Sequence, residues 1–273
     1  MYFKFMQPVV QLQNYVKYYC FMEKDAGEPN LSERVIPTES VQLMFHYRRP
    51  FVVLHHNKIV SHQPQSIISG LSNTFSDVST FGAAGVVFVA FQPVGACQFF
   101  RFPLSEIENQ SVDMKEIFNK EIREIEETLF SKNSYEERAF VINSFLLKKM
   151  NEIKRYDYLL LREGVKQIKQ SNGRIDTHTL ATMLFTTPKT LERKFATMVG
   201  KTPKQFIKLA RFQAAIDDIT LREGTKLTDY AYRNGYADQS HFIRDFKSFS
   251  GLTPKEFVAR YPDCRQNRDF DIR

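Results

Sequence analysis

Short apolar runs, rich in Phe and Val and bounded by Pro or Gly, fill the chain up to about residue 103. Runs of this kind, recurring every ten or so positions between turn residues, predict short β-strands that build a sandwich or a small barrel. The clearest runs span residues 41–45, 51–54, 66–68 and 85–91.

The spacing of apolar residues then changes to a helical period. Residues 103–107 have the features of a helix start, with Glu106 near the positive end of the helix dipole. Apolar positions three to five residues apart predict helices over 113–130, in one or two pieces, and over 135–153. The polar stretch that follows predicts a boundary between two domains, 1–153 and 154–273.

The rest of the chain has a helical pattern and contains an internal repeat. Residues 193–206 align with residues 244–257 at an offset of 51, with identical residues at 7 of the 14 positions. The repeat indicates two copies of one supersecondary unit, at about 175–200 and 225–251.

Each copy is predicted to consist of a helix, a turn and a second helix. The expected capping residues are Asp176, Thr187, Thr202, Asp238 and Thr253, and the expected turn or stop glycines are Gly200, Gly235 and Gly251. This order of elements is typical of the helix-turn-helix of DNA-binding proteins. The alternative is a helical repeat that contacts other proteins.

The distribution of charge favours DNA binding. Up to Met150 the chain has 15 basic and 16 acidic residues, a net charge of −1, whereas from Asn151 onward it has 23 and 15, a net charge of +8. A basic module joined to a neutral one is typical of nucleic-acid binding, although a solvated basic face would give the same counts.

Residues 235–247 and 251–257 together resemble the C-terminal signature of AraC/XylS-type transcription regulators. The resemblance covers about residues 159–261, including a bridging helix at 202–220, but residues 185–188 replace the usual glycine-containing turn of the first copy. Two upstream segments, 34–45 and 91–96, more weakly resemble the sensory domain of some family members.

The resemblance implies an α+β protein of two domains. The N-terminal one would be a β-rich, cupin-like barrel or sandwich with trailing helices, and the C-terminal one would be all-α with two helix-turn-helix units. The second helix of each unit would enter the major groove, which places the two helices in adjacent grooves about 34 Å apart.

Outward positions on these two helices are the expected base contacts, because Leu191 and Phe195 face inward. They are Lys189, Thr190, Arg193, Ser240, His241 and Arg244. Arg193 and Arg244 are the strongest candidates, since Arg can donate two hydrogen bonds to guanine. Phosphate contacts are expected from hydroxyls at helix starts and from nearby lysines: Thr187, Thr202, Lys247, Thr253 and Lys255.

Other chemistry has little support in the sequence. Cys20, Cys97 and Cys264 are too far apart for a disulfide scaffold or a zinc site. Four histidines of the β-rich region have no carboxylate partner in register: His46, His55, His56 and His62. We therefore expect no cofactor and no metal, and the absence of a recognisable signal peptide or membrane span predicts a cytoplasmic location.

Two classes of function remain. The first is a transcription regulator that binds double-stranded promoter DNA, responds to a small-molecule effector in the N-terminal domain and has RNA polymerase as a partner. The second is an enzyme with a small β-barrel catalytic domain and an accessory basic helical domain. The effector, the operator and the sign of regulation are not specified by the sequence.

Two finer expectations belong to the first class. Aromatic residues on the probable strands are expected to line an effector pocket, or else simply to fill the core: Phe45, Phe51, Phe88 and Phe91. The helix at 135–153 is expected to form a homodimer contact through one apolar stripe, or else to bury it within the subunit: Ile142, Phe145, Leu146, Met150 and Ile153.

Overall fold

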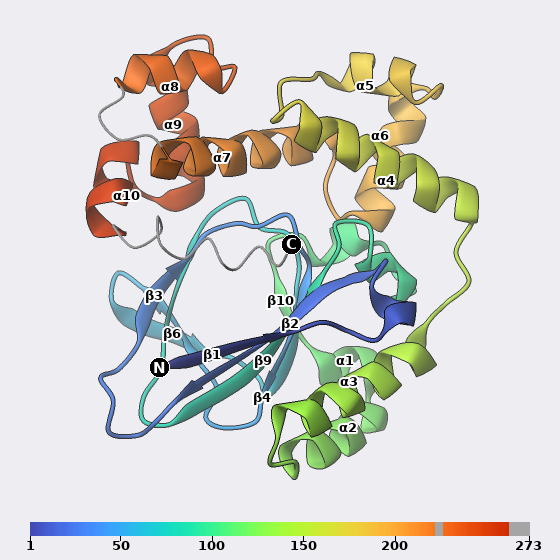
Figure 1. Ribbon diagram of the computed structural model, residues 1–273, viewed down its shortest axis with the longest axis vertical. Helices are drawn as coiled ribbons and strands as arrows, with labels where there is room; N and C mark the ends of the chain where they lie inside the picture. The colour runs from blue at the N-terminus through green and yellow to red at the C-terminus, as the bar shows by residue number, and fades with distance from the viewer. Residues whose placement is uncertain (222–225, 262–273) are drawn as a thin grey trace.

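The computed structural model of the protein describes residues 1–221 and 226–261 (Figure 1). The N-terminal part contains two β-sheets followed by helices, and the C-terminal part is a layer of helices along one side of the sheets. The predicted α+β class with two structural parts is confirmed. The predicted boundary at 153/154 falls in the irregular segment 150–154, between two helices.

The larger sheet has six strands in the order β1-β2-β9-β4-β7-β10, and the smaller sheet has four in the order β3-β8-β5-β6. All the paired strands are antiparallel. The strands are β1 (Tyr2–Met6), β2 (Val16–Lys24), β3 (Ser32–Val35), β4 (Gln42–His46), β5 (Val52–His55), β6 (Lys58–His62), β7 (Ser66–Ser69), β8 (Ser76–Ser79), β9 (Ala84–Phe91) and β10 (Ser111–Asp113).

The four predicted apolar runs coincide with β4, β5, β7 and β9. The β4 strand shows how they are used. Leu43 and Phe45 belong to the core that reaches the helices, whereas Met44 between them belongs to a small cluster between the two sheets. Both faces of the larger sheet are therefore covered, which is why β9 and the middle of β4 (residues 43–45) have apolar side chains on both faces.

The helices that follow the sheets differ in part from the prediction. Residues 103–107 form one turn of 3₁₀ helix (Leu104–Ile107), because the chain then becomes extended and Asn109 adopts a φ of 60°. The predicted helix at 113–130 is split by Asn119, which has a φ of 49°, into α1 (Met114–Phe118) and α2 (Lys120–Phe130).

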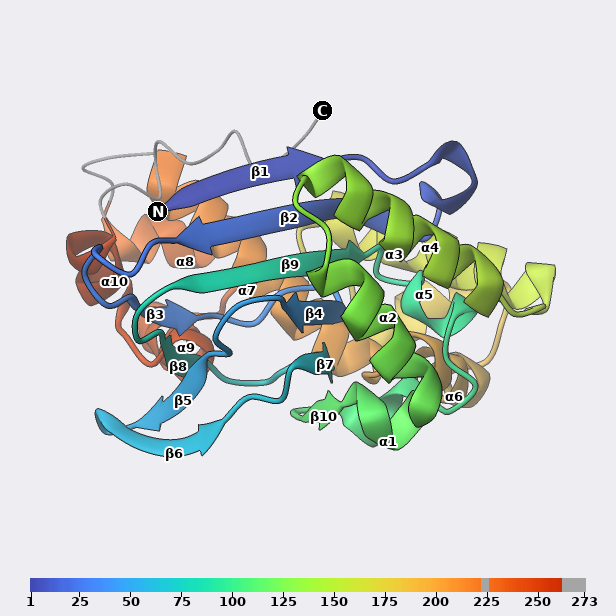
Figure 2. The same ribbon diagram turned by 90° about the horizontal axis from the view of Figure 1, so that it is seen from below.

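The α3 helix (Tyr135–Lys149) lies beside α2 on one side of the larger sheet (Figure 2). A reciprocal capping box between Ser134 and Glu137 fixes its start. It ends before the predicted Ile153, because the backbone at Met150 is already extended.

The C-terminal domain is entirely helical in its described residues. Figure 1 shows α7 running across the domain, with α4–α6 at one end and α8–α10 at the other. The helices are α4 (Arg155–Gln170), α5 (Thr177–Met183), α6 (Pro188–Met198), α7 (Pro203–Leu221), α8 (Leu227–Arg233), α9 (Gln239–Ser250) and α10 (Pro254–Arg260).

Three apolar cores hold the molecule together. The largest runs without a break from the sheet and α1–α3 into α4, α5, α6 and the first half of α7. A second core belongs to α7–α10, and the third is the small cluster between the sheets. The two halves of the C-terminal domain are thus built into the molecule differently.

Candidate nucleic-acid interface

The first helix-turn-helix unit consists of α5 and α6. Asp176 and Thr187 cap these helices and accept hydrogen bonds from backbone N–H groups three residues ahead, at 2.9 and 3.2 Å. Pro188 follows at the first helical position, where its missing N–H costs nothing. Leu191 and Phe195 are fully buried on the inner side of α6, so the opposite face turns outward as predicted.

The second unit consists of α8 and α9 and repeats this construction. Asp238 caps α9 by accepting a hydrogen bond from the backbone N–H of His241 at 2.7 Å. The inner side of α9 is buried through Phe242, Phe246 and Phe249. The helix ends at Gly251, whose φ of 72° is the left-handed conformation that glycine adopts without steric cost.

The turns inside the two units share one backbone conformation, although only one contains glycine. Phe185 has a φ of 51° and Gly235 a φ of 72°. In each turn the next N–H donates to the carbonyl five residues back: Thr186 to Ala181 at 3.0 Å and Tyr236 to Ala231 at 2.9 Å. The absence of glycine at residues 185–188 therefore leaves the geometry of the first turn unchanged.

Four of the six candidate base contacts are exposed on the outer faces of α6 and α9: Lys189, Arg193, Ser240 and Arg244. Arg193 and Arg244 form no ion pair with any described residue, so both guanidinium groups are available for a ligand. Thr190 is partly covered and accepts a hydrogen bond from the Thr187 hydroxyl at 2.9 Å. His241 is half-buried, with its Nε2 3.6 Å from a carboxylate oxygen of Asp245.

The candidate phosphate contacts fall into two groups. Lys247 and Lys255 are exposed, and Thr187 is an exposed cap. Thr202 and Thr253 cap α7 and α10 and are partly covered. Thr202 lies next to the N-terminal domain, where its partner Gln205 donates to Glu108 at 2.9 Å. A carboxylate already occupies that location, which makes it unfavourable for a phosphate.

Lys201 is a contact between the domains that the sequence did not reveal. Its side chain has no exposed area, and its ammonium group donates to Asn73 Oδ1 at 2.6 Å and to Glu108 Oε1 at 3.1 Å. Burial lowers the pKa of this lysine, and the hydrogen bond to Glu108 acts in the opposite direction. The sequence shows only that a lysine follows Gly200, the glycine after α6. A lysine in such a position normally lies on the solvated surface, so its burial could not be predicted.

The predicted aromatic pocket is corrected, because the four phenylalanines pack in apolar clusters and none of them lines the hollows described below. Phe51 and Phe88 belong to the cluster between the sheets, but Phe45 and Phe91 lie on the other face, in the core shared with the helices. The reason is the alternation of side chains along a strand, which sends neighbouring aromatic residues to opposite faces.

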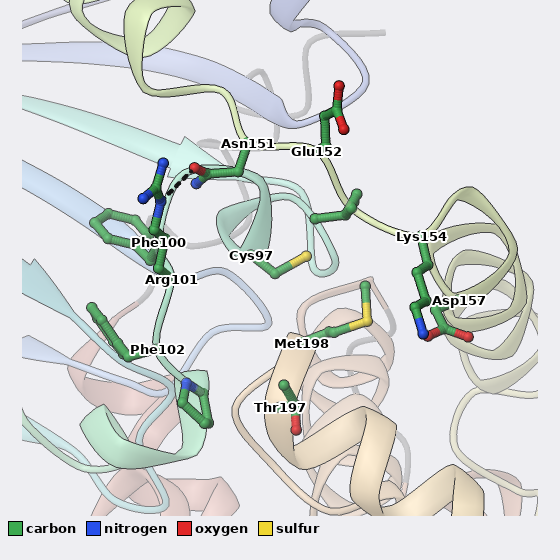
Figure 3. Close-up of a pocket in the computed structure, with 12 residues that line it drawn as sticks. Cys97, Phe100, Arg101, Phe102, Asn151, Glu152, Lys154, Asp157, Thr197 and Met198 are labelled. Carbon is green, nitrogen blue, oxygen red and sulfur yellow. Dashed lines mark hydrogen bonds between the residues drawn. The ribbon is translucent and has the colours of Figure 1, made fainter.

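Several hollows lie at or near the domain junction, and two of them bear on the proposals below. A small one of about 100 Å³ lies at the edge of the two sheets, lined by residues of segments 35–44 and 69–76. A cleft of about 530 Å³ lies between the N-terminal domain, the 151–154 segment and the end of α6 (Figure 3). Figure 3 shows Phe100, Phe102 and Met198 around it, with Arg101 bonded to Asn151 at 3.0 Å.

Sites for other chemistry are few in the described residues. They contain no group of three or more His, Cys, Asp or Glu side chains that could hold a metal ion. Cys20 and Cys97 are buried free thiols, and Cys264 lies outside the described residues. None of the helices in the described ranges has the length and apolar character that crossing a membrane requires.

Two family models match the chain. Residues 180–260 match the family described as "Helix-turn-helix domain", and residues 4–113 match a "Domain of unknown function (DUF6597)". The first match spans both units described above. The predicted helix-turn-helix domain of the AraC type is thereby confirmed for the C-terminal part.

The chain is also similar to individual proteins. An uncharacterized HTH-type transcriptional regulator of Staphylococcus aureus (strain MRSA252) is 33% identical over 78 residues, which are 29% of this chain. The chain spans only 10% of the length of that relative.

Two solved structures are more distant. The structure of ToxT from Vibrio cholerae has 14% identity and a TM-score of 0.47, covering 88% of this chain and 97% of that one. A DNA-binding transcriptional dual regulator from Escherichia coli K-12 has 23% identity and a TM-score of 0.34, covering 41% of this chain and 98% of that one.

Proposed function

We propose that this chain, whose residues 180–260 belong to the helix-turn-helix domain family, is a sequence-specific DNA-binding transcription regulator. One observation carries the proposal: two equivalent helices, attached to the same helix α7, both turn exposed basic residues outward. Arg193 and Arg244 have matching places on α6 and α9, and both are free to donate to guanine.

The whole chain is the right material for the test, because the first unit shares its core with the N-terminal domain. Selection of binding sequences from random duplex DNA should enrich a site with two half-sites about one helical turn apart. Binding to that site should weaken steeply with salt, as expected when lysines and arginines displace counterions.

A matched set of variants separates base contacts from general charge. The double variant Arg193→Ala/Arg244→Ala should lose most specific affinity. Arg123→Ala, which removes an exposed arginine from α2, should leave that affinity unchanged. If no sequence is enriched and the variants behave alike, the proposal fails and the alternative, an enzyme with an accessory basic domain, gains support.

The N-terminal domain is proposed to bind a small-molecule effector. The small hollow and the cleft of Figure 3 support this part of the proposal, since a ligand in either would contact both the N-terminal domain and segments that adjoin the DNA-binding domain. Thermal-shift screening of the whole chain against small-molecule classes tests it, and a stabilising compound should also change the affinity for the selected DNA.

Homodimerisation is also proposed, but through a different face of α3 from the one expected. Leu146 is only 1% exposed and packs inside the subunit, whereas Phe140 is 72% exposed. Leu147 and Val10 are further exposed apolar side chains, and the N–H of the adjoining Val9 donates to Asn143 on the same helix at 3.2 Å.

A charge at Phe140 tests the dimer. In sedimentation the wild type should have twice the mass of Phe140→Glu, and Phe185→Glu, a charge at another exposed phenylalanine, should leave the dimer intact. Equal masses for all three proteins would contradict the proposed contact. Interaction with RNA polymerase and a cytoplasmic location complete the proposal, because a regulator of this kind acts on promoters.

A further inference from the structure

The N-terminal domain holds the two helix-turn-helix units in different ways. The first unit is fused to it through the largest apolar core, and the buried Lys201 adds hydrogen bonds to Asn73 and Glu108. The second unit has its own core, in which Ile36 is the N-terminal neighbour among the described residues. The second unit is therefore the half that is attached by few contacts.

Arg34 on β3 makes the central one of these contacts. Its guanidinium forms a two-point ion pair with Asp77, with hydrogen bonds of 2.7 and 2.8 Å. The same group stacks over the ring of Phe75 at 3.9 Å and donates its remaining Nη1 to the carbonyl of Ser250 at 3.3 Å. Asp77 and Phe75 thus hold the cation rigidly toward α9.

The place that Arg34 contacts is the C-terminal end of the second recognition helix. Helix carbonyls there have no helical partner and carry partial negative charge, so a cation is favoured. Gly251 lets the two domains approach closely, since a Cβ at this position would lie 2.4 Å from Phe75 and 2.6 Å from Arg34. Glycine is needed here for the contact as well as for its φ of 72°.

The small hollow at the edge of the sheets adjoins this contact. Its lining includes Val35 and Ile36, which follow Arg34, and Thr74 and Ser76, which flank Phe75. A change in the hollow would therefore move residues that are covalent neighbours of the contact. The N-terminal domain has in this way a short physical connection to the second unit.

We propose that Arg34, stacked on Phe75 and fixed by Asp77, is a latch that sets the position of the second helix-turn-helix unit relative to the first. This inference rests on the proposed DNA-binding function for its consequence. A latched protein accepts one spacing of DNA half-sites, and a released protein accepts several, because the second unit is then restrained mainly by α7.

Hydrogen exchange of the whole chain tests the latch without DNA. Arg34→Met keeps much of the apolar length of the side chain but removes the donor. It should raise amide exchange about ten-fold at residues 250–253 and leave residues 199–203 unchanged. Arg48→Met, at a more exposed arginine that pairs with Glu23 and Asp25, is the control and should alter neither turn.

A second variant distinguishes loss of the Arg34 contact from a general folding defect. Phe75→Leu leaves Arg34 and Asp77 in place but weakens the stacking, and it should give the same local pattern with a smaller amplitude. An equal rise of exchange in both turns, or no rise at residues 250–253, would overturn the latch as a selective attachment.

Binding to DNA sites with altered half-site spacing tests the effect of the latch on DNA recognition. On the selected site, wild type should prefer the original spacing over insertions of one or two base pairs, and Arg34→Met should reduce this preference about ten-fold. An unchanged preference would limit Arg34 to a structural role and overturn the regulatory part. If wild type selects no DNA, the proposed function fails, while the exchange experiment still decides whether the contact is selective.

Discussion

The two helix-turn-helix units are nearly the same on the outward faces of α6 and α9 and different at the opposite side. Both have polar N-caps, the same left-handed turn and an exposed arginine at the same place on the second helix. Behind this face, the first unit continues into the core of the N-terminal domain, and the second closes on itself. The repeated sequence determines the exposed face of each unit. The packing behind that face determines how strongly each unit is attached to the N-terminal domain.

One pair of equivalent residues shows how a small change separates the units. At the offset of 51, Lys201 corresponds to Leu252. Leu252 packs against the second unit's own core, whereas Lys201 reaches out to the N-terminal domain. An apolar residue at this position keeps the unit independent, and a long cation joins it to a partner.

The largest expected effect is the loss of a core phenylalanine, and it should differ in extent between the units. Phe195→Ala and Phe246→Ala should each cost about 3–5 kcal/mol, because both rings are fully buried. Phe195→Ala should destabilise the N-terminal domain too, and Phe246→Ala only the second unit. Chemical unfolding followed by hydrogen exchange distinguishes the two, and identical exchange patterns would contradict the separate cores.

The next effect concerns the attachment of the first unit. Glu108→Ala should destabilise it by about 2 kcal/mol, because it leaves the buried Lys201 with Asn73 as its remaining acceptor. Glu106→Ala, a change of the same charge two residues earlier, is the control. Equal destabilisation by both variants in thermal unfolding would show that the Lys201–Glu108 pair is not what matters.

Substitutions on the outward faces of α6 and α9 should have the same kind of effect in both units. Arg193→Ala and Arg244→Ala should each weaken specific binding by roughly 1–3 kcal/mol and relax the preference at one base position, each in its own half-site. The measurement is affinity against a panel of single-base changes. A uniform loss over the whole panel would assign the arginine to a phosphate instead.

Phe185 and Gly235 occupy the same position in the turns of the two units, so each can be replaced by a residue of the other kind. Phe185→Gly should stabilise the first unit by about 1 kcal/mol, because an L-residue other than glycine is strained at a φ of 51°. Gly235→Ala should destabilise the second unit by at least as much, since its Cβ would also lie 2.7 Å from Arg174. Changes of the same sign in thermal unfolding would contradict the common turn geometry.

The smallest effect is a pH dependence that only the first unit should show. The pKa of Lys201 is lowered by burial, so between that value and 10.5 the unfolded chain holds a proton that the folded chain lacks. Raising the pH through this window should therefore stabilise the first unit. The gain should be absent in Lys201→Met, and an equal pH dependence in both proteins would assign it to other groups.

The sequence predicted helix boundaries at positions where the residue type strongly favours one structural role, such as capping or ending a helix. Thr-Pro, Asp at a helix start and Gly after a helix predicted the caps and stops of both units, and the 51-residue repeat predicted their pairing. It predicted only those strands that are apolar on both faces. Strands such as β3 and β6, which are exposed along most of their length, have no apolar run to reveal them.

The exposed residues of the candidate site could be predicted from the sequence. The contacts that join the helix-turn-helix units to the N-terminal domain could not. Helical periodicity alone places Arg193 and Arg244 outside once Phe195 and Phe246 are inside. Lys201 and Arg34 could not be recognised, because a buried cation is identified by partners that lie far away in the chain. The same holds for Leu146, whose apolar stripe is covered by the subunit's own core.

The separate core of the second unit also bears on how such proteins diversify. Its apolar contacts begin within α7, at Leu209 and Phe212, and are closed by α8–α10. A recombination event inside α7 could therefore transplant this half from another regulator and change one half-site while the sensing domain stays intact. The first half offers no such breakpoint, because its side chains share one apolar core with the sheet.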